Sequence, residues 1–255
     1  MRAIVTRPHA QAQSWVAQLK AQGIDAAALP LIRIDPAPDP AAVQHAWHEI
    51  ESYALLVFVS PNAVDAFFSL RPPAKHWPPA VLAGSTGPGT SAALREHGVP
   101  DASLVEPAAD ARQFDSEALW AQLASRPWQG RAVLLVRGEG GRDWLGQTLA
   151  QAGATVRALA AYRRAEPVLD DTTRALLEAA QREPAVHAWL FSSSEAIDNL
   201  KRLAPQAQWR ASIALTTHPR IGESARTAGF GTVIEIRTGV EAAVAALREL
   251  QSKAR

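Results

Sequence analysis

Short apolar runs alternate with stretches of helical periodicity along the whole chain. The runs are continuously apolar rather than alternating, which is typical of strands buried on both faces of a sheet. They cover residues 2–6, 55–60, 80–84, 131–137, 188–192, 212–216 and 232–236. Strands of this kind, separated by amphipathic helices, indicate parallel sheets flanked by helices. The predicted fold class is therefore α/β.

Small and polar residues mark the expected helix ends. Several strands run into Ser, Thr or Asn with a nearby Pro, the pattern of an N-cap and a first helical turn. Helices are predicted to begin near Asn62, Thr90, Arg142, Glu195 and Arg220, and to stop at Gly23, Gly98, Gly153 and Gly229. These helix starts follow the carboxyl ends of parallel strands, which form the ligand-binding edge of open α/β sheets. Each start offers N–H donors worth about 0.3–1 kcal/mol per anionic contact.

The second half of the chain resembles the first. Residues 2–5 match residues 131–134, and residues 60–65 match residues 193–198. The loop after one later strand also matches its counterpart, with Thr86, Pro88 and Gly98 opposite Thr217, Pro219 and Gly229. This similarity predicts two related α/β lobes.

Two segments, residues 31–38 and 160–167, hold equivalent positions in the two halves, and each runs into chain that contains proline. Chain breaks of this composition are typical of connections between domains. Two extended crossovers predict a discontinuous first lobe, residues 1–36 with 165–255, and a second lobe, residues 37–164. A division into two sequential halves remains the alternative, because periodicity alone does not separate the two layouts.

Composition narrows the function. The 255 residues include 26 Lys+Arg against 25 Asp+Glu, a net charge of +1, which argues against a nucleic-acid binder with a broad basic field. The absence of cysteine excludes disulfides, thiolate nucleophiles and Cys-ligated metal sites. The N-terminal segment is too polar for a signal-peptide core, and no apolar run approaches the ~20 residues that span a bilayer. A soluble cytoplasmic protein is expected.

Conventional motifs are weak. Residues 87–92 fit G-x-G-x-x-A, with Glu106 where a dinucleotide site keeps its ribose-binding acid. Pro88 fixes this turn, however, and the equivalent loop in the second half lacks the glycines. His45, His48 and Glu49 do not have the spacing of a zinc site, and Ser192–Ser194 is no nucleophile elbow.

An ordered set of segments nevertheless resembles uroporphyrinogen-III synthase. The segments are Thr6-Arg7-Pro8, residues 57–64, residues 84–90 with Leu94 and Gly98, Leu135-Val136-Arg137-Gly138, Ala161-Tyr162-Arg163-Arg164 and residues 190–194. Each is short, but together they cover nearly the whole chain in the right order and spacing.

The resemblance implies two α/β lobes joined by a two-stranded linker, with both chain ends in one lobe. It also implies a lyase of tetrapyrrole, porphyrin and heme biosynthesis that works in the cleft between the lobes without a cofactor. Such an enzyme cyclises linear hydroxymethylbilane, expels water and inverts the terminal D ring. It implies no nucleic-acid or membrane partner; we expect a monomer, with transient handover of substrate from hydroxymethylbilane synthase.

The resemblance also implies site residues. Tyr162 matches the family's candidate tyrosine, a phenol facing the cleft that donates a proton or hydrogen bond to the departing hydroxyl; a packed hinge tyrosine is the alternative. Thr90 would bind substrate at a helix start or simply cap it. The remaining substrate-binding candidates are the carboxylate contacts Ser60, Ser193 and Ser194 and the acetate or propionate partners Arg7 and Arg137. His218 and residues 138–141 have no assigned role.

Two other functions stay open at this point. Paired α/β lobes with two crossovers also suit a small-molecule binding protein that closes about a hinge. The glycine turn at residue 87 leaves a dinucleotide-dependent oxidoreductase as a third interpretation.

Overall fold

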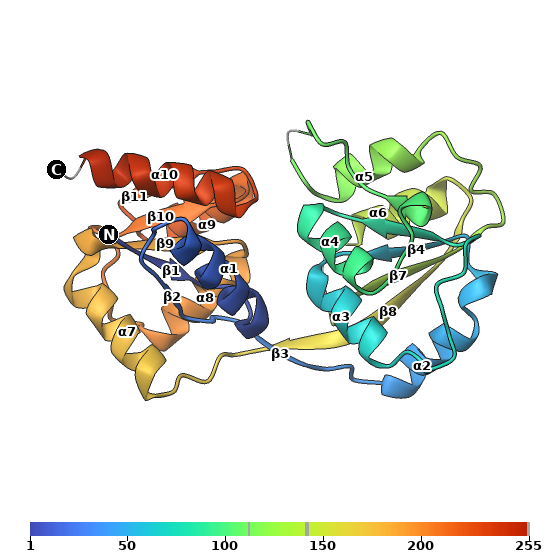
Figure 1. The fold of residues 1–255 in the computed structure, drawn as a ribbon, viewed down its shortest axis with the longest axis horizontal. Coiled ribbons are helices and arrows are strands. Elements are labelled where there is room, and N and C mark those ends of the chain that lie inside the picture. The colour runs from blue at the N-terminus through green and yellow to red at the C-terminus, as the bar shows by residue number, and fades with distance from the viewer. Residues whose placement is uncertain (112, 141–142, 254–255) are drawn as a thin grey trace. The chain divides into compact units, whose positions relative to one another are not determined.

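The computed structural model describes residues 1–111, 113–140 and 143–253. The chain forms two compact units. Unit 1 comprises Met1–Arg33 and Ala165–Arg255, and unit 2 comprises Ile34–Arg164. Each unit is a sheet with helices on both faces (Figure 1), which confirms the predicted α/β class with parallel sheets.

The sheet of unit 1 has the order β11-β10-β9-β1-β2 within the described residues, and its strand pairs are parallel. The strands are β1 (Arg2–Val5), β2 (Ala26–Ala28), β9 (His187–Phe191), β10 (Ile213–Thr216) and β11 (Thr232–Glu235). All but β2 coincide with predicted apolar runs. Strand β2 is a three-residue alanine segment, too short to stand out as a run.

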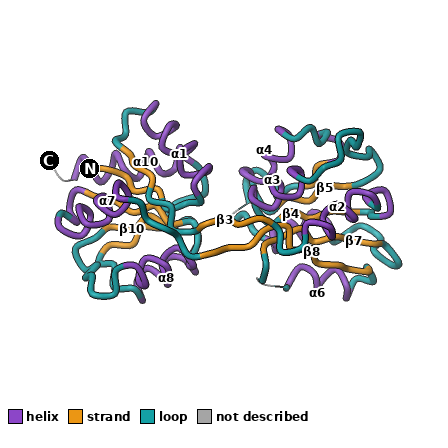
Figure 2. The backbone as a smooth tube through the Cα atoms, turned by 90° about the horizontal axis from the view of Figure 1, so that it is seen from below, coloured by secondary structure: helices purple, strands orange, loops and turns teal. Residues whose placement is uncertain are grey.

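Helices cover both faces of this sheet (Figure 2). Helices α1 (His9–Ala21) and α10 (Val240–Lys253) share a buried apolar cluster with one face, in which Val5, Leu190 and Leu215 take part. Helix α8 (Ser194–Leu203) lies on the other face and packs against α9 (Pro219–Thr227). Helix α7 (Asp171–Arg182) and the 3-10 helix η3 (Pro184–Val186) lead into β9.

The sheet of unit 2 has the order β3-β8-β7-β4-β5-β6 within the described residues. Its strands are β3 (Arg33–Pro36), β4 (Leu55–Phe58), β5 (Leu82–Ser85), β6 (Leu104–Val105), β7 (Ala132–Gly138) and β8 (Thr155–Ala165). The run β6-β5-β4-β7-β8 repeats the order β11-β10-β9-β1-β2 of unit 1 element by element. The two units therefore share a topology, in agreement with the internal sequence similarity.

The alternation of side chains along β4 shows how this sheet is covered. Leu56 and Phe58 join a core with α2 (Pro40–His48), α3 (Pro61–Ser69) and α4 (Pro88–Glu96). Leu55 and Val57 join a second core with α5 (Ser116–Leu123) and α6 (Trp144–Gln151). Two 3-10 helices lie in connections between helices and strands: η1 (Ile50–Ser52) between α2 and β4, and η2 (Asp101–Ser103) between α4 and β6. Both faces are buried, which explains the continuous apolar run.

The predicted helix ends agree closely with the structure. Gly23, Gly98, Gly153 and Gly229 follow their helices with φ values of 75°, 86°, 96° and 95°, the left-handed conformation that favours glycine. Helices α3, α4, α8 and α9 begin one or two residues earlier than predicted. The start predicted at Arg142 lies outside the described residues.

The crossover segments contain strands that the apolar pattern did not reveal. Strand β3 lies within residues 31–38, and β8 extends into residues 160–167. Strand β8 exposes Arg157 and Arg163, so it lacks the all-apolar signature of a central strand. In the described part of the chain, no helix is both long and apolar enough to cross a membrane.

Candidate active site

Four of the candidate residues belong to unit 2 and lie toward the carboxyl ends of its parallel strands. Ser60 follows β4, Arg137 is near the end of β7, Tyr162 is near the end of β8, and Thr90 is in α4 after β5. Strands β8, β7, β4 and β5 are neighbours in that order. The topology thus gathers these residues at one sheet edge, where open α/β sheets bind ligands.

Tyr162 is fully buried. Its hydroxyl lies 3.1 Å from Ser60 Oγ and accepts a hydrogen bond from Arg164 Nη2 at 3.3 Å. The ring packs in the core beneath α3 and against Gly138, so the phenol is not exposed in this structure, and its role in the reaction stays a prediction. The alternative of a packed tyrosine describes the side chain better, although its hydroxyl bonds to side chains rather than to the backbone.

Ser60 is the partly exposed partner of Tyr162. It is the N-cap of α3, and its Oγ accepts a hydrogen bond from the Ala63 N–H at 3.2 Å. The predicted N-cap chemistry of this helix is therefore confirmed. The side chain joins a buried phenol on one side to the first turn of a helix on the other.

Thr90 does not cap α4. The helix starts at Pro88 with Gly87 as N-cap, so Thr90 lies inside the first turn and is buried. Proline is favoured as the first helical residue, which moves the start ahead of Thr90. The capping interpretation is thus wrong, whereas a role in binding substrate is not tested by this geometry. Arg137 Nη1 lies 3.5 Å from Asp143 Oδ1, so its charge is paired within unit 2.

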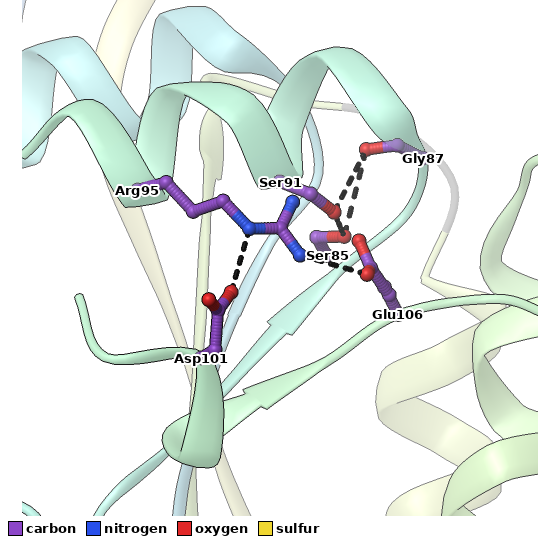
Figure 3. A network of polar contacts seen from close by, with 6 residues as sticks. All are labelled: Ser85, Gly87, Ser91, Arg95, Asp101 and Glu106. Carbon is purple, nitrogen blue, oxygen red and sulfur yellow. Dashed lines mark hydrogen bonds and ion pairs between the residues drawn. The ribbon is translucent and has the colours of Figure 1, made fainter.

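A polar network ties both ends of α4 to neighbouring segments (Figure 3). Ser85 Oγ and Ser91 Oγ are 2.5 Å apart, and Arg95 binds both Asp101 at 2.7 Å and Glu106 at 2.9 Å. Burial alone would raise the pKa of Glu106, but hydrogen bonds from Ser91 and Arg95 keep it below its ordinary value. The carboxylate proposed as a ribose-binding acid is thus engaged by Arg95 and Ser91, which counts against a dinucleotide site.

Unit 1 carries the other three candidates, also at strand ends. Arg7 follows β1, whereas Ser193 and Ser194 follow β9, and these two strands pair in parallel. Ser193 is the N-cap of α8 but makes no side-chain capping bond. Ser194 Oγ accepts a hydrogen bond from Ser224 Oγ at 2.9 Å. The serines therefore differ, because Ser194 is tied to α9 whereas the Ser193 hydroxyl is not used as a cap.

Arg7 is a partly buried cation. Its guanidinium lies 4.3 Å from the centre of the Trp15 ring, and Nη1 donates to Gln11 Oε1 at 3.3 Å. Burial lowers the pKa of Arg7 to about 10. No Asp or Glu pairs with it among residues 1–111, 113–140 and 143–253. A desolvated guanidinium in this setting favours an anionic ligand.

The residues without an assigned role are partly explained. His218 Nδ1 accepts from the Arg220 N–H at 3.1 Å, so this histidine caps α9. Gly138 lies against the Tyr162 ring, where a Cβ atom would come within 2.8 Å of Cζ. Gly141, at the end of the glycine-rich stretch, lies outside the described residues. His45 Nε2 pairs with Glu49 Oε1 at 2.8 Å on an exposed helix face.

No cluster of three or more His, Cys, Asp and Glu side chains suited to a metal ion occurs in the described residues. Two residues that contact Tyr162, Gly138 and Arg164, were not among the residues for which the sequence predicted a role. Arg164 could have been found from the two-residue period of a strand, which places it on the same face as Tyr162. That signal requires strand β8, which the apolar pattern did not reveal.

Comparison with known proteins agrees with this architecture. A family model described as uroporphyrinogen-III synthase HemD matches residues 13–245. The chain is 28% identical over 207 residues to the uroporphyrinogen-III synthase of Salmonella typhimurium, covering 81% of each chain. It is also 28% identical over 228 residues to that of Synechococcus elongatus, covering 86% of this chain and 81% of the relative.

Solved structures share the fold. A mutant uroporphyrinogen III synthase from Thermus thermophilus has a TM-score of 0.61 at 16% identity, covering 99% of both chains. The Helicobacter pylori uroporphyrinogen-III synthetase has a TM-score of 0.58 at 16% identity, covering 98% of this chain and all of the other. The match over residues 13–245 spans both units and every candidate residue except Arg7. The chain belongs to the uroporphyrinogen-III synthase family.

Proposed function

We propose that the chain is a cyclising lyase that converts linear hydroxymethylbilane to uroporphyrinogen III, with loss of water and inversion of the terminal D ring. The observation that carries this proposal is the family match over residues 13–245. The strand-end positions of the candidate residues support it, because they lie where sheets of this type bind ligands.

The reaction demands control of geometry more than strong acid–base chemistry. Loss of the terminal hydroxyl leaves an electron-poor azafulvene, which a pyrrole carbon attacks, and a spiro intermediate leads to the inverted ring. The substrate also closes without an enzyme, to the uninverted isomer. Holding the reacting ends in one orientation is therefore the main task, and positioning of this kind lowers barriers substantially. The steps neither consume nor release electrons, so the chemistry needs no redox cofactor.

Binding of the substrate carboxylates falls to groups at the sheet edges. The proposed contacts are Arg7, Ser60, Thr90, Arg137, Ser193 and Ser194. Arg7 is the strongest of these, since its guanidinium is partly desolvated and has no acidic partner in the described residues. Helix starts at Ser60 and Ser193 add N–H donors, which stabilise anions without any net basic charge on the protein.

Tyr162 is proposed as the source of the proton that the departing hydroxyl receives. Its side chain is buried, and its hydroxyl bonds to the partly exposed Ser60. The enzyme is further proposed to be a cytoplasmic monomer that receives its unstable substrate by transient handover from hydroxymethylbilane synthase.

The decisive experiment supplies freshly generated hydroxymethylbilane to the purified protein, oxidises the products and separates uroporphyrin I from uroporphyrin III by chromatography. The expected result is an excess of the III isomer over a protein-free control. An Arg7→Met variant should still give the III isomer at saturating substrate, with a higher KM. Isomer I alone, from folded protein and live substrate, would refute the proposal, and tight substrate binding in that case would indicate a binding protein.

A further inference from the structure

Three side chains of unit 2 form a continuous hydrogen-bonded chain. Arg164 Nη2 lies 3.3 Å from the Tyr162 hydroxyl, and that hydroxyl lies 3.1 Å from Ser60 Oγ. Tyr162 has no exposed surface, whereas Ser60 is partly exposed at the start of α3. The chain therefore runs from strand β8 through the core to a serine at the ligand-binding edge of the sheet.

Donor and acceptor chemistry fixes the direction of the protons. A guanidinium only donates, so the Tyr162 oxygen accepts from Arg164. The Tyr162 hydrogen then points to Ser60 Oγ, the remaining partner of this buried hydroxyl in the described residues. Ser60 Oγ also accepts from the Ala63 N–H, which fills its second lone pair. The hydrogen of Ser60 is thus left to point outward.

We propose that Ser60 is the group that touches the departing hydroxyl, that Tyr162 replaces its proton from behind, and that Arg164 is the positioning residue that orients Tyr162. This inference rests on the proposed function, because it assigns roles within that reaction. It changes the roles of two residues, because the buried phenol of Tyr162 acts through Ser60, and Ser60 touches the departing hydroxyl rather than a substrate carboxylate.

The proton transfers balance. As the C–O bond of the hydroxymethyl group breaks, its electron pair stays on the oxygen, which takes the Ser60 proton and leaves as water. Ser60 Oγ takes the Tyr162 proton in the same step, and the resulting phenolate is stabilised by the Arg164 cation. The pyrrole carbon that closes the ring releases one proton, which restores the phenol. No oxidant, reductant or further reactant is needed.

A double-mutant cycle tests whether Arg164 acts through Tyr162. Arg164→Met and Tyr162→Phe are each expected to lower kcat about tenfold with little change in KM, since general acid catalysis contributes factors of this order or larger. The double variant should be no slower than Tyr162→Phe alone, because residues that act as a unit are not additive. Arg164→Lys, which keeps a cationic donor, should recover most of the activity.

Two variants serve as matched controls. Arg163→Met removes the neighbouring charge, which pairs with Asp35 at 3.6 Å on the exposed side of β8, and should leave kcat unchanged. Asp39 is the N-cap of α2, and its Oδ1 accepts a hydrogen bond from the Ala42 N–H at 3.1 Å. Asp39→Ala removes a helix cap away from Tyr162, so it shows how much of the effect of Ser60→Ala comes from loss of a cap alone. Multiplicative losses in the double variant, or an Arg164→Met variant that changes KM alone, would overturn the proposal.

A spectroscopic measurement tests the chain without turnover. Tyr53 and Tyr162 are the two tyrosines of the sequence, so a Tyr53→Phe variant with ring-labelled tyrosine gives an infrared C–O band from Tyr162 alone. The position of this band depends on whether the hydroxyl donates or accepts. Ser60→Ala and Arg164→Met should therefore shift it in opposite directions, whereas Arg163→Met should not shift it.

The two measurements separate the possible failures. If the wild-type protein makes no III isomer but the band shifts as expected, the proposed function fails while the hydrogen-bonded chain stands as structure. If the III isomer forms and Ser60→Ala does not shift the band, Tyr162 does not donate to Ser60 and the inference is wrong.

Discussion

The close packing of Gly138 against Tyr162 predicts that the methyl group added by Gly138→Ala destabilises the protein. A Cβ atom at position 138 would lie 2.8 Å from Tyr162 Cζ, 2.9 Å from Cε2 and 3.2 Å from the hydroxyl oxygen. The first two distances are shorter than real Cβ contacts, so the ring would have to move. The φ angle of Gly138 is outside the left-handed region, and the predicted effect of Gly138→Ala therefore comes from the contact and not from backbone strain.

The ring has little freedom to retreat. It is fully buried, and its hydroxyl is bonded to Ser60 and Arg164. Overpacking of this kind costs about 1–3 kcal/mol, and displacement of the hydroxyl adds about 0.5–1.5 kcal/mol for a lost hydrogen bond. Gly138→Ala should thus lower the free energy of unfolding by about 3 kcal/mol, which corresponds to a fall in Tm of about 6–12 °C.

Thermal and urea denaturation measure this change, and the isomer assay measures activity. If the hydroxyl chain moves with the ring, kcat should fall about tenfold as in Tyr162→Phe. Gly89→Ala is the matched control, because its Cβ would meet Pro61 Cγ at an ordinary 3.7 Å. It should be neutral or slightly stabilising within a helix. A Gly138→Ala protein with wild-type stability and kcat would refute the reasoning.

Three further predictions concern single side chains. Arg7→Met should raise KM about tenfold through loss of a charge-assisted contact. Burial lowers the pKa of Arg7 to about 10, so the lower KM of the wild type should be present below this pH and disappear as the pH rises through it. Measurement of KM against pH for both proteins tests this. Gly222→Ser should stabilise the protein by about 1 kcal/mol in thermal melts, since Thr216 Oγ1, buried without a partner in the described residues, lies 3.3 Å from the new Cβ; an unchanged or lower Tm would contradict this. Asn199→Leu should destabilise by about 2 kcal/mol in urea, because its Nδ2 donates to the buried Leu31 carbonyl at 2.6 Å; retention of wild-type stability would show that water replaces the bond.

The two units differ at one matched position, where unit 1 has Gly222 and unit 2 has Ser91. Ser85 and Thr216 end equivalent strands, and both lie under the first turn of the following helix. In unit 2 that helix supplies Ser91, whose Oγ is 2.5 Å from Ser85 Oγ. In unit 1 the equivalent residue is Gly222, so the Thr216 hydroxyl lacks the corresponding partner. The variant transfers the unit 2 arrangement to unit 1.

Local sequence determined the α/β class, the central strands and the helix ends. Strands such as β4 are buried on both faces, and this burial requires continuous apolar residues that are visible without a structure. Glycines such as Gly98 and Gly229 end helices because glycine has no Cβ atom and therefore adopts the left-handed conformation without a steric cost. The order of short motifs likewise sufficed to indicate the family, since it requires only position along the chain.

Tertiary structure alone decided what the site residues touch. Tyr162 and Ser60 are separated by 102 positions, and no local pattern shows that β8 and β4 lie on either side of β7. Burial of the Tyr162 ring depends on packing beneath α3, and the burial of Thr90 depends on a helix start set by Pro88. Periodicity reports which faces of a segment are apolar, whereas hydrogen-bond partners follow from how distant segments pack together.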